Sequence, residues 1–226
     1  MTKDKLMNSG RMKAHQKYIL KSGREVPGAS TIAKMLDSGG GLIQWAWNLG
    51  KAGIDYRKFR DATAEVGTLA HEKLMAHHRG TTVDISQYLP EINDQSENCL
   101  KSYYAWEKNH VIKPVSCEIG YVSETYKFGG TIDLVAEIDG QLELADYKTG
   151  KRIYDSHWLQ LAGYLLLLEE AGVKVNQARI INIPRSEGDE FVDSYRKDLS
   201  KEKAIFIKLC EIYHLQHDKT PQNATK

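Results

Sequence analysis

The chain has 226 residues, a formal net charge of +1 and 41% hydrophobic residues. This length favours a single domain, residues 1–226, with a sizeable core. A near-neutral chain could hold nucleic acid only through a local basic patch. No apolar run approaches the ~20 residues that cross a bilayer, and the polar N-terminus lacks the apolar core of a secretion signal, so we expect a cytoplasmic protein without membrane contact. Three scattered cysteines favour a reducing compartment and no disulfide framework: Cys99, Cys117 and Cys210.

The first part of the chain predicts short elements separated by glycine and proline. We expect residues 1–16 to be flexible and residues 18–26 to form a small hairpin. Ser30 is placed to cap a helix that ends by the triple glycine at 39–41. Residues 42–52 form the next predicted helix, and core packing is the expected role of its two tryptophans, Trp45 and Trp47.

Asp55 is placed to cap a long helix that reaches about His78. His71 lies close to the apolar side of this helix, where a histidine is either a buried structural residue or a metal ligand. Glu65 and Glu72 are alternative ligands on the same helix. Glu72 is the weaker candidate, because it points about 100° away from His71.

A hairpin further along the chain brings like charges together. Residues 131–138 alternate, which predicts Ile132, Leu134, Ala136 and Ile138 on one face of a strand. Asp139-Gly140 is the pair that a two-residue type I′ turn prefers, and residues 141–148 return as the partner strand. This register places Asp133 opposite Asp146, with Lys148 on the same face. The cluster is either a structural ion pair or a site where a divalent cation lies between the carboxylates.

The remaining segments predict an α/β domain with a mixed sheet. A helix over 91–109 and a strand over 115–121 precede the hairpin. After it, Asp155 or Ser156 caps a helix that ends near Gly172 and carries Gln160 and Tyr164 on one face. Strands at 178–183 and 191–192 and a helix from Ser200 follow, and we expect residues 217–226 to be flexible.

The ordered motifs resemble the PD-(D/E)XK nuclease superfamily, specifically its RecB-like exonuclease branch, and within it phage exonucleases and the mitochondrial genome maintenance exonuclease. The resemblance lies in Gly129-Gly130-Thr131-Ile132-Asp133, in Asp146-Tyr147-Lys148-Thr149, in Gln160-x-x-x-Tyr164 and in Gly67-Thr68-x-x-His71. It implies a restriction-endonuclease-like core: a central mixed β-sheet flanked by helices, with an N-terminal helical region.

The resemblance also implies residue roles. One or two Mg²⁺ or Mn²⁺ ions would be held by His71, Asp133, Asp146 and the backbone carbonyl of Tyr147. Asp133, Asp146 and Lys148 would be catalytic, with Lys148 orienting or deprotonating the attacking water or holding a phosphate oxygen. Three residues would contact nucleic acid: Thr149, Gln160 and Tyr164, with core packing as the alternative for Tyr164. An iron–sulfur cluster, found in some relatives, is not expected, because it needs four cysteines.

Glutamate is common in the branch at the position of Glu118. This residue therefore either approaches the metal site or lies on an exposed strand face.

Three functions fit these residues. The first is a metal-dependent exonuclease that hydrolyses DNA from ends or single strands in recombination, repair or phage DNA processing. It would act in the cytoplasm of a bacterium or a phage-infected host, and an annealing or recombination protein is a candidate partner. The second is a structure-specific or restriction-like endonuclease on the same fold. The third, a non-catalytic nucleic-acid-binding module, is disfavoured because Asp133, Asp146 and Lys148 are all retained.

Overall fold

The computed structural model describes residues 17–37, 39–186 and 188–217. The termini predicted to be flexible lie outside these ranges, except for His217, which ends the last helix. In chain order the elements are β1 (Tyr18–Ile19), β2 (Glu25–Val26), α1 (Ala29–Ala33), the 3-10 helix η2 (Lys34–Leu36), α2 (Gly40–Lys51), α3 (Tyr56–Arg79), α4 (Pro90–Glu107), β3 (Ile112–Ser123), β4 (Phe128–Ile138), β5 (Gln141–Lys148), α5 (Asp155–Glu170), β6 (Gln177–Asn182), β7 (Val192–Arg196) and α6 (Ser200–His217).

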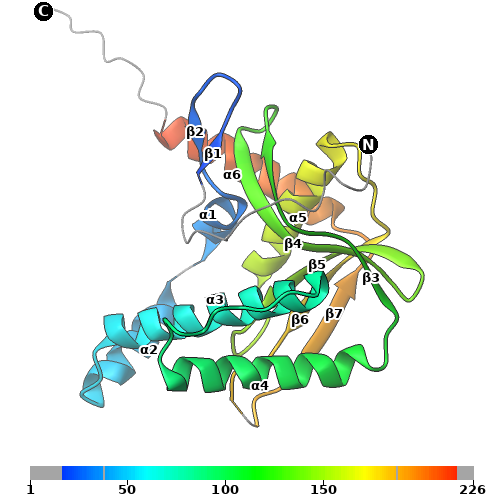
Figure 1. Cartoon of the computed structure of the whole chain (residues 1–226). Coiled ribbons are helices and arrows are strands. Elements are labelled where there is room, and N and C mark those ends of the chain that lie inside the picture. The colour runs from blue at the N-terminus through cyan, green and yellow to red at the C-terminus, as the bar shows by residue number, and fades with distance from the viewer. Residues whose placement is uncertain (1–16, 38, 187, 218–226) are drawn as a thin grey trace, which may run out of the picture.

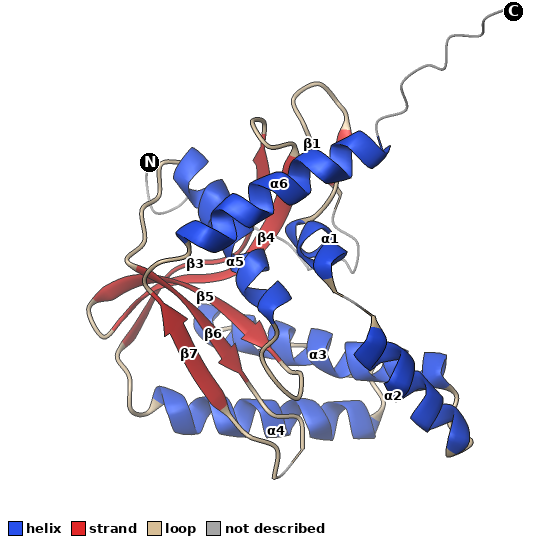
Figure 2. Cartoon of the chain, turned by 180° about the vertical axis from the view of Figure 1, so that it is seen from behind, coloured by secondary structure: helices blue, strands red, loops and turns tan. Residues whose placement is uncertain are grey.

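A five-stranded sheet in the order β3-β4-β5-β6-β7 forms the centre, and β1 pairs with β2 in a separate small sheet. Within the large sheet only β5 and β6 are parallel, since α5 connects them as a crossover. Helices α3 and α4 cover one face, while α5 and α6 cover the other (Figures 1 and 2). The predicted mixed sheet flanked by helices is therefore confirmed. None of the described helices is long and apolar enough to span a bilayer.

The central strands β4, β5 and β6 are buried on both faces and largely apolar, whereas the edge strands β3 and β7 are partly exposed. The larger apolar cluster joins α1, α5 and α6 to the sheet, with Phe206 and Leu161 at its centre. The second cluster lies under α3 and α4 around Tyr103 and Tyr147. Strand β4 contributes to both clusters. Its residue Ile132 packs in the first, so the expectation that it shares a face with Leu134, Ala136 and Ile138 is wrong.

The hairpin between β4 and β5 forms as the sequence predicts. Asp139 and Gly140 have φ values of 51° and 81°, the positive values that a type I′ turn requires. The Asp139 carboxylate also accepts hydrogen bonds from the backbone N–H of Val111 at 2.9 Å and from His110 Nδ1 at 2.6 Å, which ties the turn to the start of β3. Pairing runs from Ile138 and Gln141 to Leu134 and Ala145, which confirms the register.

Helix ends show where local signals decide the structure. Asp55 caps α3 as predicted, accepting from the backbone N–H of Arg57 at 2.8 Å and of Lys58 at 3.2 Å. The other two predicted caps are wrong. Gly28 is the N-cap of α1, which places Ser30 inside the helix, and Tyr154 is the N-cap of α5. The short α1 ends at Ala33 because the chain tightens there into a 3-10 turn.

Helix α2 projects beyond the sheet and packs on the start of α3 (Figures 1 and 2). None of its residues, all described, is buried. Trp45 contacts Tyr56 and Phe59 edge-on, with ring centroids 5.3 and 5.9 Å apart, whereas Trp47 is 63% exposed. The prediction that both tryptophans pack in the core is therefore wrong, because amphipathic spacing does not say whether a partner surface exists.

Candidate active site

Asp133 and Asp146 adjoin the pair Leu134 and Ala145, which ends the β4–β5 ladder on the side away from the turn. This is the position that the register predicts for them. Both are buried, with exposed fractions of 8% and 1%. Asp133 Oδ2 accepts a hydrogen bond from the backbone N–H of Tyr147 at 2.9 Å. This bond joins the Asp133 side chain of β4 to the backbone of β5, between Asp146 and Lys148.

His71 reaches the same carboxylate from α3. Its Nδ1 lies 3.5 Å from Asp133 Oδ2. The helix can approach because residue 67 is glycine: a Cβ there would lie only 3.0 Å from Thr149 Oγ1, just beyond the end of β5. Gly67 thus leaves room for the Thr149 side chain beside α3, one turn before His71.

Lys148 connects the carboxylates to α5. Its Nζ lies 2.5 Å from Asp146 Oδ2 and donates to Gln160 Oε1 at 3.1 Å. Gln160 Nε2 in turn donates to the hydroxyl of Tyr164 at 2.6 Å. The two α5 residues, four apart on one face as predicted, therefore form a chain of contacts that ends at Lys148.

Tyr164 is 6% exposed, and its ring packs against β4 where residue 130 is glycine. A Cβ at Gly130 would lie 2.6 Å from Tyr164 Cε1, so this close contact requires glycine. The buried ring corresponds to the core-packing alternative for Tyr164. Contacts of Thr149 and Gln160 with nucleic acid stay predictions.

The two carboxyl groups differ in acidity. Burial raises the pKa of Asp146 to about 6, with the charge of Asp133 adding to this effect and Lys148 opposing it. Burial acts on Asp133 too, but His71, Lys148 and the Tyr147 N–H outweigh it and hold the pKa of Asp133 below its usual value. Burial lowers and Asp133 raises the pKa of His71, and the net effect is an increase. One carboxyl is thus stabilised as an anion and the other is not.

The residues fit a divalent cation. Asp146 Oδ2 is buried, and the contact that it makes is the 2.5 Å ion pair with Lys148, which also bonds to Gln160. Carboxylate oxygens with one imidazole are a donor set that hard to intermediate divalent ions accept. Asp133, Asp146 and His71 can therefore hold a metal ion.

The structure places the three glutamate candidates differently. Glu65 is exposed, and Glu72 accepts from the hydroxyl of Tyr88 at 3.1 Å, so neither belongs to the cluster. Glu118 is buried on β3, between the positions that pair with β4 on either side of Asp133, and pairs with Arg79 at 3.1 Å. The exposed-face alternative for Glu118 is wrong. Burial raises its pKa, although Arg79 opposes this effect.

Asn182 was missed by sequence reasoning. It is fully buried, pairs with Lys148 across the parallel β5–β6 ladder, and donates from Nδ2 to the carbonyl of Gly150 at 3.0 Å. It therefore holds the turn that follows the Asp146-Tyr147-Lys148 strand. Only the β5–β6 register reveals this position, and no local pattern encodes the register of a parallel pair.

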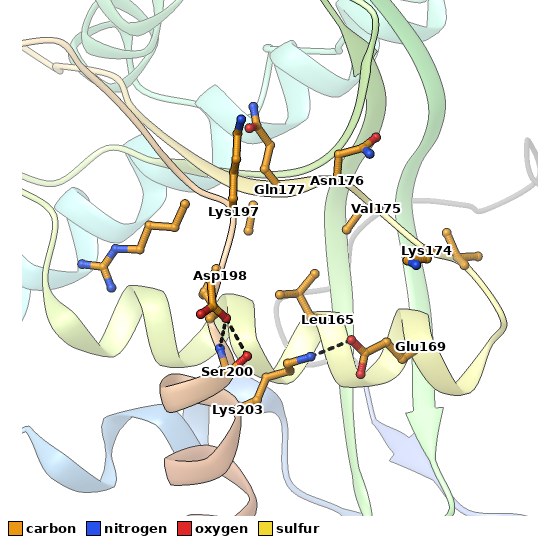
Figure 3. A pocket seen from close by; sticks show the side chains of 14 residues that line it. Leu165, Glu169, Lys174, Val175, Asn176, Gln177, Lys197, Asp198, Ser200 and Lys203 are labelled. Atoms are coloured by element: carbon orange, nitrogen blue, oxygen red, sulfur yellow. Dashed lines mark hydrogen bonds and ion pairs between the residues drawn. The ribbon is translucent and has the colours of Figure 1, made fainter.

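A cavity of about 200 Å³ lies elsewhere, among residues of α5, β6 and α6 (Figure 3). Lys203 and Glu169 form an ion pair at its edge at 2.7 Å, and Asp198 caps α6 through Ser200. Its lining includes Gln177, the first residue of β6, whereas Asn182 at the other end of that strand lies beside Lys148. The cavity is therefore separate from the carboxylate cluster.

Comparison with known proteins identifies the family. Residues 46–222 match the family model of the PD-(D/E)XK nuclease superfamily. No curated protein matches the sequence. Among solved structures, SSO0001 matches with 17% identity and a TM-score of 0.36 over 71% of this chain and 74% of that one. A candidate exonuclease from Eubacterium rectale matches with 8% identity and a TM-score of 0.45 over 67% and 65%. The assignment rests on the family model, which covers His71, Asp133, Asp146 and Lys148: the chain belongs to the PD-(D/E)XK nuclease superfamily.

Proposed function

We propose that this protein is a Mg²⁺- or Mn²⁺-dependent DNA exonuclease of the RecB-like branch, acting on DNA ends in recombination, repair or phage DNA processing. Nucleases of the superfamily use divalent metal ions and act on DNA. The observation that carries the proposal is the convergence of His71, Asp133, Asp146 and Lys148 around a buried carboxylate oxygen.

His71, Asp133, Asp146 and the backbone carbonyl of Tyr147 would hold the metal. When bound, it would lower the pKa of a coordinated water and neutralise charge that develops on the phosphate. The hydrogen bond from the Tyr147 N–H and the contact with His71 keep Asp133 anionic and oriented for this role. Asp146, whose pKa burial raises to about 6, is the ligand whose anion gains most from a nearby cation.

Lys148 would position the attacking water or a phosphate oxygen. A charged ammonium group has three N–H donors. Lys148 donates to Gln160 and pairs with Asp146, and three donors leave it able to bind a group outside the cluster as well. Gln160 therefore supports the reaction by fixing the Lys148 side chain, and Tyr164 supports it by fixing Gln160.

The exonuclease proposal rests on the histidine of α3 and the Gln160-x-x-x-Tyr164 pair of α5, which the family resemblance associates with the RecB-like branch. The β4–β5 hairpin itself is shared with restriction-like endonucleases. A single-strand annealing or recombination protein as a partner is part of the proposal and follows from the same resemblance.

Linear and covalently closed circular DNA of the same sequence would test the proposal. With Mg²⁺ or Mn²⁺ we expect progressive shortening of the linear molecule from its ends and survival of the circle. Efficient cutting of the circle would instead identify an endonuclease. Binding of both substrates without any cleavage in either metal would exclude catalysis. Asp146→Asn serves as the inactive control.

A further inference from the structure

A second cluster of metal-binding side chains lies between α3 and α4. His77 Nε2 contacts the Glu107 carboxylate at 2.8 and 3.0 Å. His78 Nε2 lies 2.8 Å from the hydroxyl of Tyr147 and 3.3 Å from that of Tyr103. One ligand atom from each of His77, His78 and Glu107 lies within 4.8 Å of the others. Among the described residues this is the only group of three or more histidine, cysteine or acidic side chains that meets this criterion.

We propose that His77, His78 and Glu107 form a binding site for a transition-metal ion of the Zn²⁺ class. Two imidazoles and one carboxylate form a common three-ligand zinc set, with a fourth position left for water. Imidazole nitrogens favour such ions over Mg²⁺, which prefers oxygen ligands. The carboxylate cluster at Asp133 and Asp146 has the opposite preference, so one chain would carry two sites of different selectivity.

The surroundings support binding at this position. His77 and Glu107 are partly exposed, so an ion can enter from solvent. The hydroxyl of Tyr103 lies 3.4 Å from Glu107 Oε1 and also contacts His78, so one buried side chain restrains two of the three ligands. The ligands come from two helices that already pack together, so binding requires side-chain adjustment only. Nitrogen and oxygen ligands around a tetrahedral zinc lie about 3.3 Å apart, so the three groups need to close by about 1.5 Å or less.

The site is connected to β5, because Tyr147 lies between Asp146 and Lys148 in the sequence and its ring stacks on that of His78, with 6.2 Å between centroids. His78 also follows His71 by two turns of α3, which places the two histidines on one side of the helix about 10 Å apart along its axis. The metal site is nevertheless independent of the proposed nuclease function, since none of its three ligands belongs to the carboxylate cluster.

Titration of the full-length protein with Zn²⁺ in excess Mg²⁺ would test the proposal. Calorimetry is expected to show an uptake of Zn²⁺ whose affinity falls at least tenfold in His77→Gln and in Glu107→Gln. Zn²⁺ that displaces Mg²⁺ from the carboxylate cluster would bind equally to all these proteins, so the difference isolates the new site. With Co²⁺ as the probe, the absorption of a tetrahedral ion should appear in the wild type and weaken in both variants.

His110→Gln is the matched control. His110 pairs with Asp139 at 2.6 Å in a similar histidine–carboxylate contact, but no third described histidine, cysteine or acidic side chain lies close enough to complete a metal site with them. The Zn²⁺ affinity of this variant should equal that of the wild type. Unchanged affinity in both His77→Gln and Glu107→Gln, or an equal loss in His110→Gln, would overturn the proposal and leave the cluster as a hydrogen-bonded brace between α3 and α4. Thermal melts without metal would verify that each variant is folded.

Discussion

Strand β5 carries two buried carboxylates on opposite faces of the sheet, and their surroundings differ. Glu143 faces the side of α4, and Asp146 faces the side of α5, because side chains separated by an odd number of positions point to opposite faces. Both are about 1% exposed, and each has a cation nearby. Glu143 and Asp146 thus have similar burial, and they differ in how many hydrogen bonds hold their carboxylates.

The Glu143 cluster is complete. Arg179 donates to Glu143 at 2.6 and 3.1 Å and to both oxygens of Asp193 at 2.7 Å. Gln177 donates to Glu143 at 2.6 Å, and Trp106 donates to Asp193 at 2.9 Å. Each carboxylate is held by two side chains through three hydrogen bonds, so the charges of this cluster are paired within the protein.

The Asp146 cluster has an equal number of acidic groups, Asp133 and Asp146, but Lys148 pairs with only one of them. Buried carboxylates with many hydrogen-bond donors join elements together, whereas buried carboxylates with few donors favour binding of a cation. The number of hydrogen bonds, and not the number of charges, distinguishes a structural cluster from a candidate site on this strand.

The largest effect is expected from Lys148→Ala. Removing the ammonium should lower the cleavage rate about 10²–10⁴-fold, the range for loss of a positioned proton-transfer group. Metal and DNA binding should largely persist, because the carboxylates remain. Cleavage assays with calorimetry of Mn²⁺ binding would measure both quantities. A loss of less than tenfold, ~1.4 kcal/mol of barrier, would contradict the role of Lys148.

Arg179→Met tests the opposite face. It leaves Glu143 and Asp193 without their common partner, and breaking a buried pair in this way costs ~3–5 kcal/mol. We expect a fall of that size in the free energy of unfolding, measured with urea, and unchanged cleavage per folded molecule. Reduced cleavage by fully folded protein at low temperature would show that the two faces of β5 are not independent.

Mg²⁺ or Mn²⁺ should raise the melting temperature, because each ion binds to the native state alone. At an ion concentration a hundred times the dissociation constant, the free energy of unfolding should rise by ~2.7 kcal/mol. The increase should be absent or much smaller in Asp146→Asn and intact in Arg179→Met. A wild-type melting temperature that does not respond to either ion would mean that the Asp146 cluster is structural.

The smallest effect is expected from Asp146→Asn without metal, which should stabilise the protein by ~1–2 kcal/mol at pH 7. Facing unit charges ~5 Å apart repel by about 3 kcal/mol at an effective dielectric of ~20, and Lys148 offsets part of this. The pKa of Asp146 is about 6 in the folded state and 3.8 in the unfolded state, so between pH 4 and pH 6 the native state binds more protons than the unfolded state. The ionised Asp146 side chain therefore lowers the free energy of unfolding as the pH rises through this range.

Asparagine does not titrate, so the stabilisation by Asp146→Asn should be close to zero near pH 4 and complete above pH 7. Urea unfolding in EDTA across this range would measure it. Destabilisation at pH 7 would instead indicate that the ion pair with Lys148 outweighs the repulsion from Asp133.

Much of the site follows from local sequence. The Asp139-Gly140 turn determines the hairpin register, and the register determines that Asp133 and Asp146 come together. The contact between Lys148 and Gln160 was not predicted, nor was the role of Asn182, because both depend on how α5 and β6 return to β5. The network of Arg179 with Glu143 and Asp193 was missed for the same reason: it joins β5, β6 and β7, and no periodicity along one strand reports on its neighbours.

The parallel pairing of β5 with β6 also has a consequence for the order of folding. The β4–β5 hairpin involves neighbours in the sequence and closes with little loss of chain entropy, whereas β5 meets β6 only after α5 has crossed over. We therefore expect the two aspartates to meet before Gln160 and Asn182 arrive to fix Lys148 and the following turn. Refolding should accordingly be faster when the repulsion is reduced, whether by a mildly acidic buffer or by Asp146→Asn.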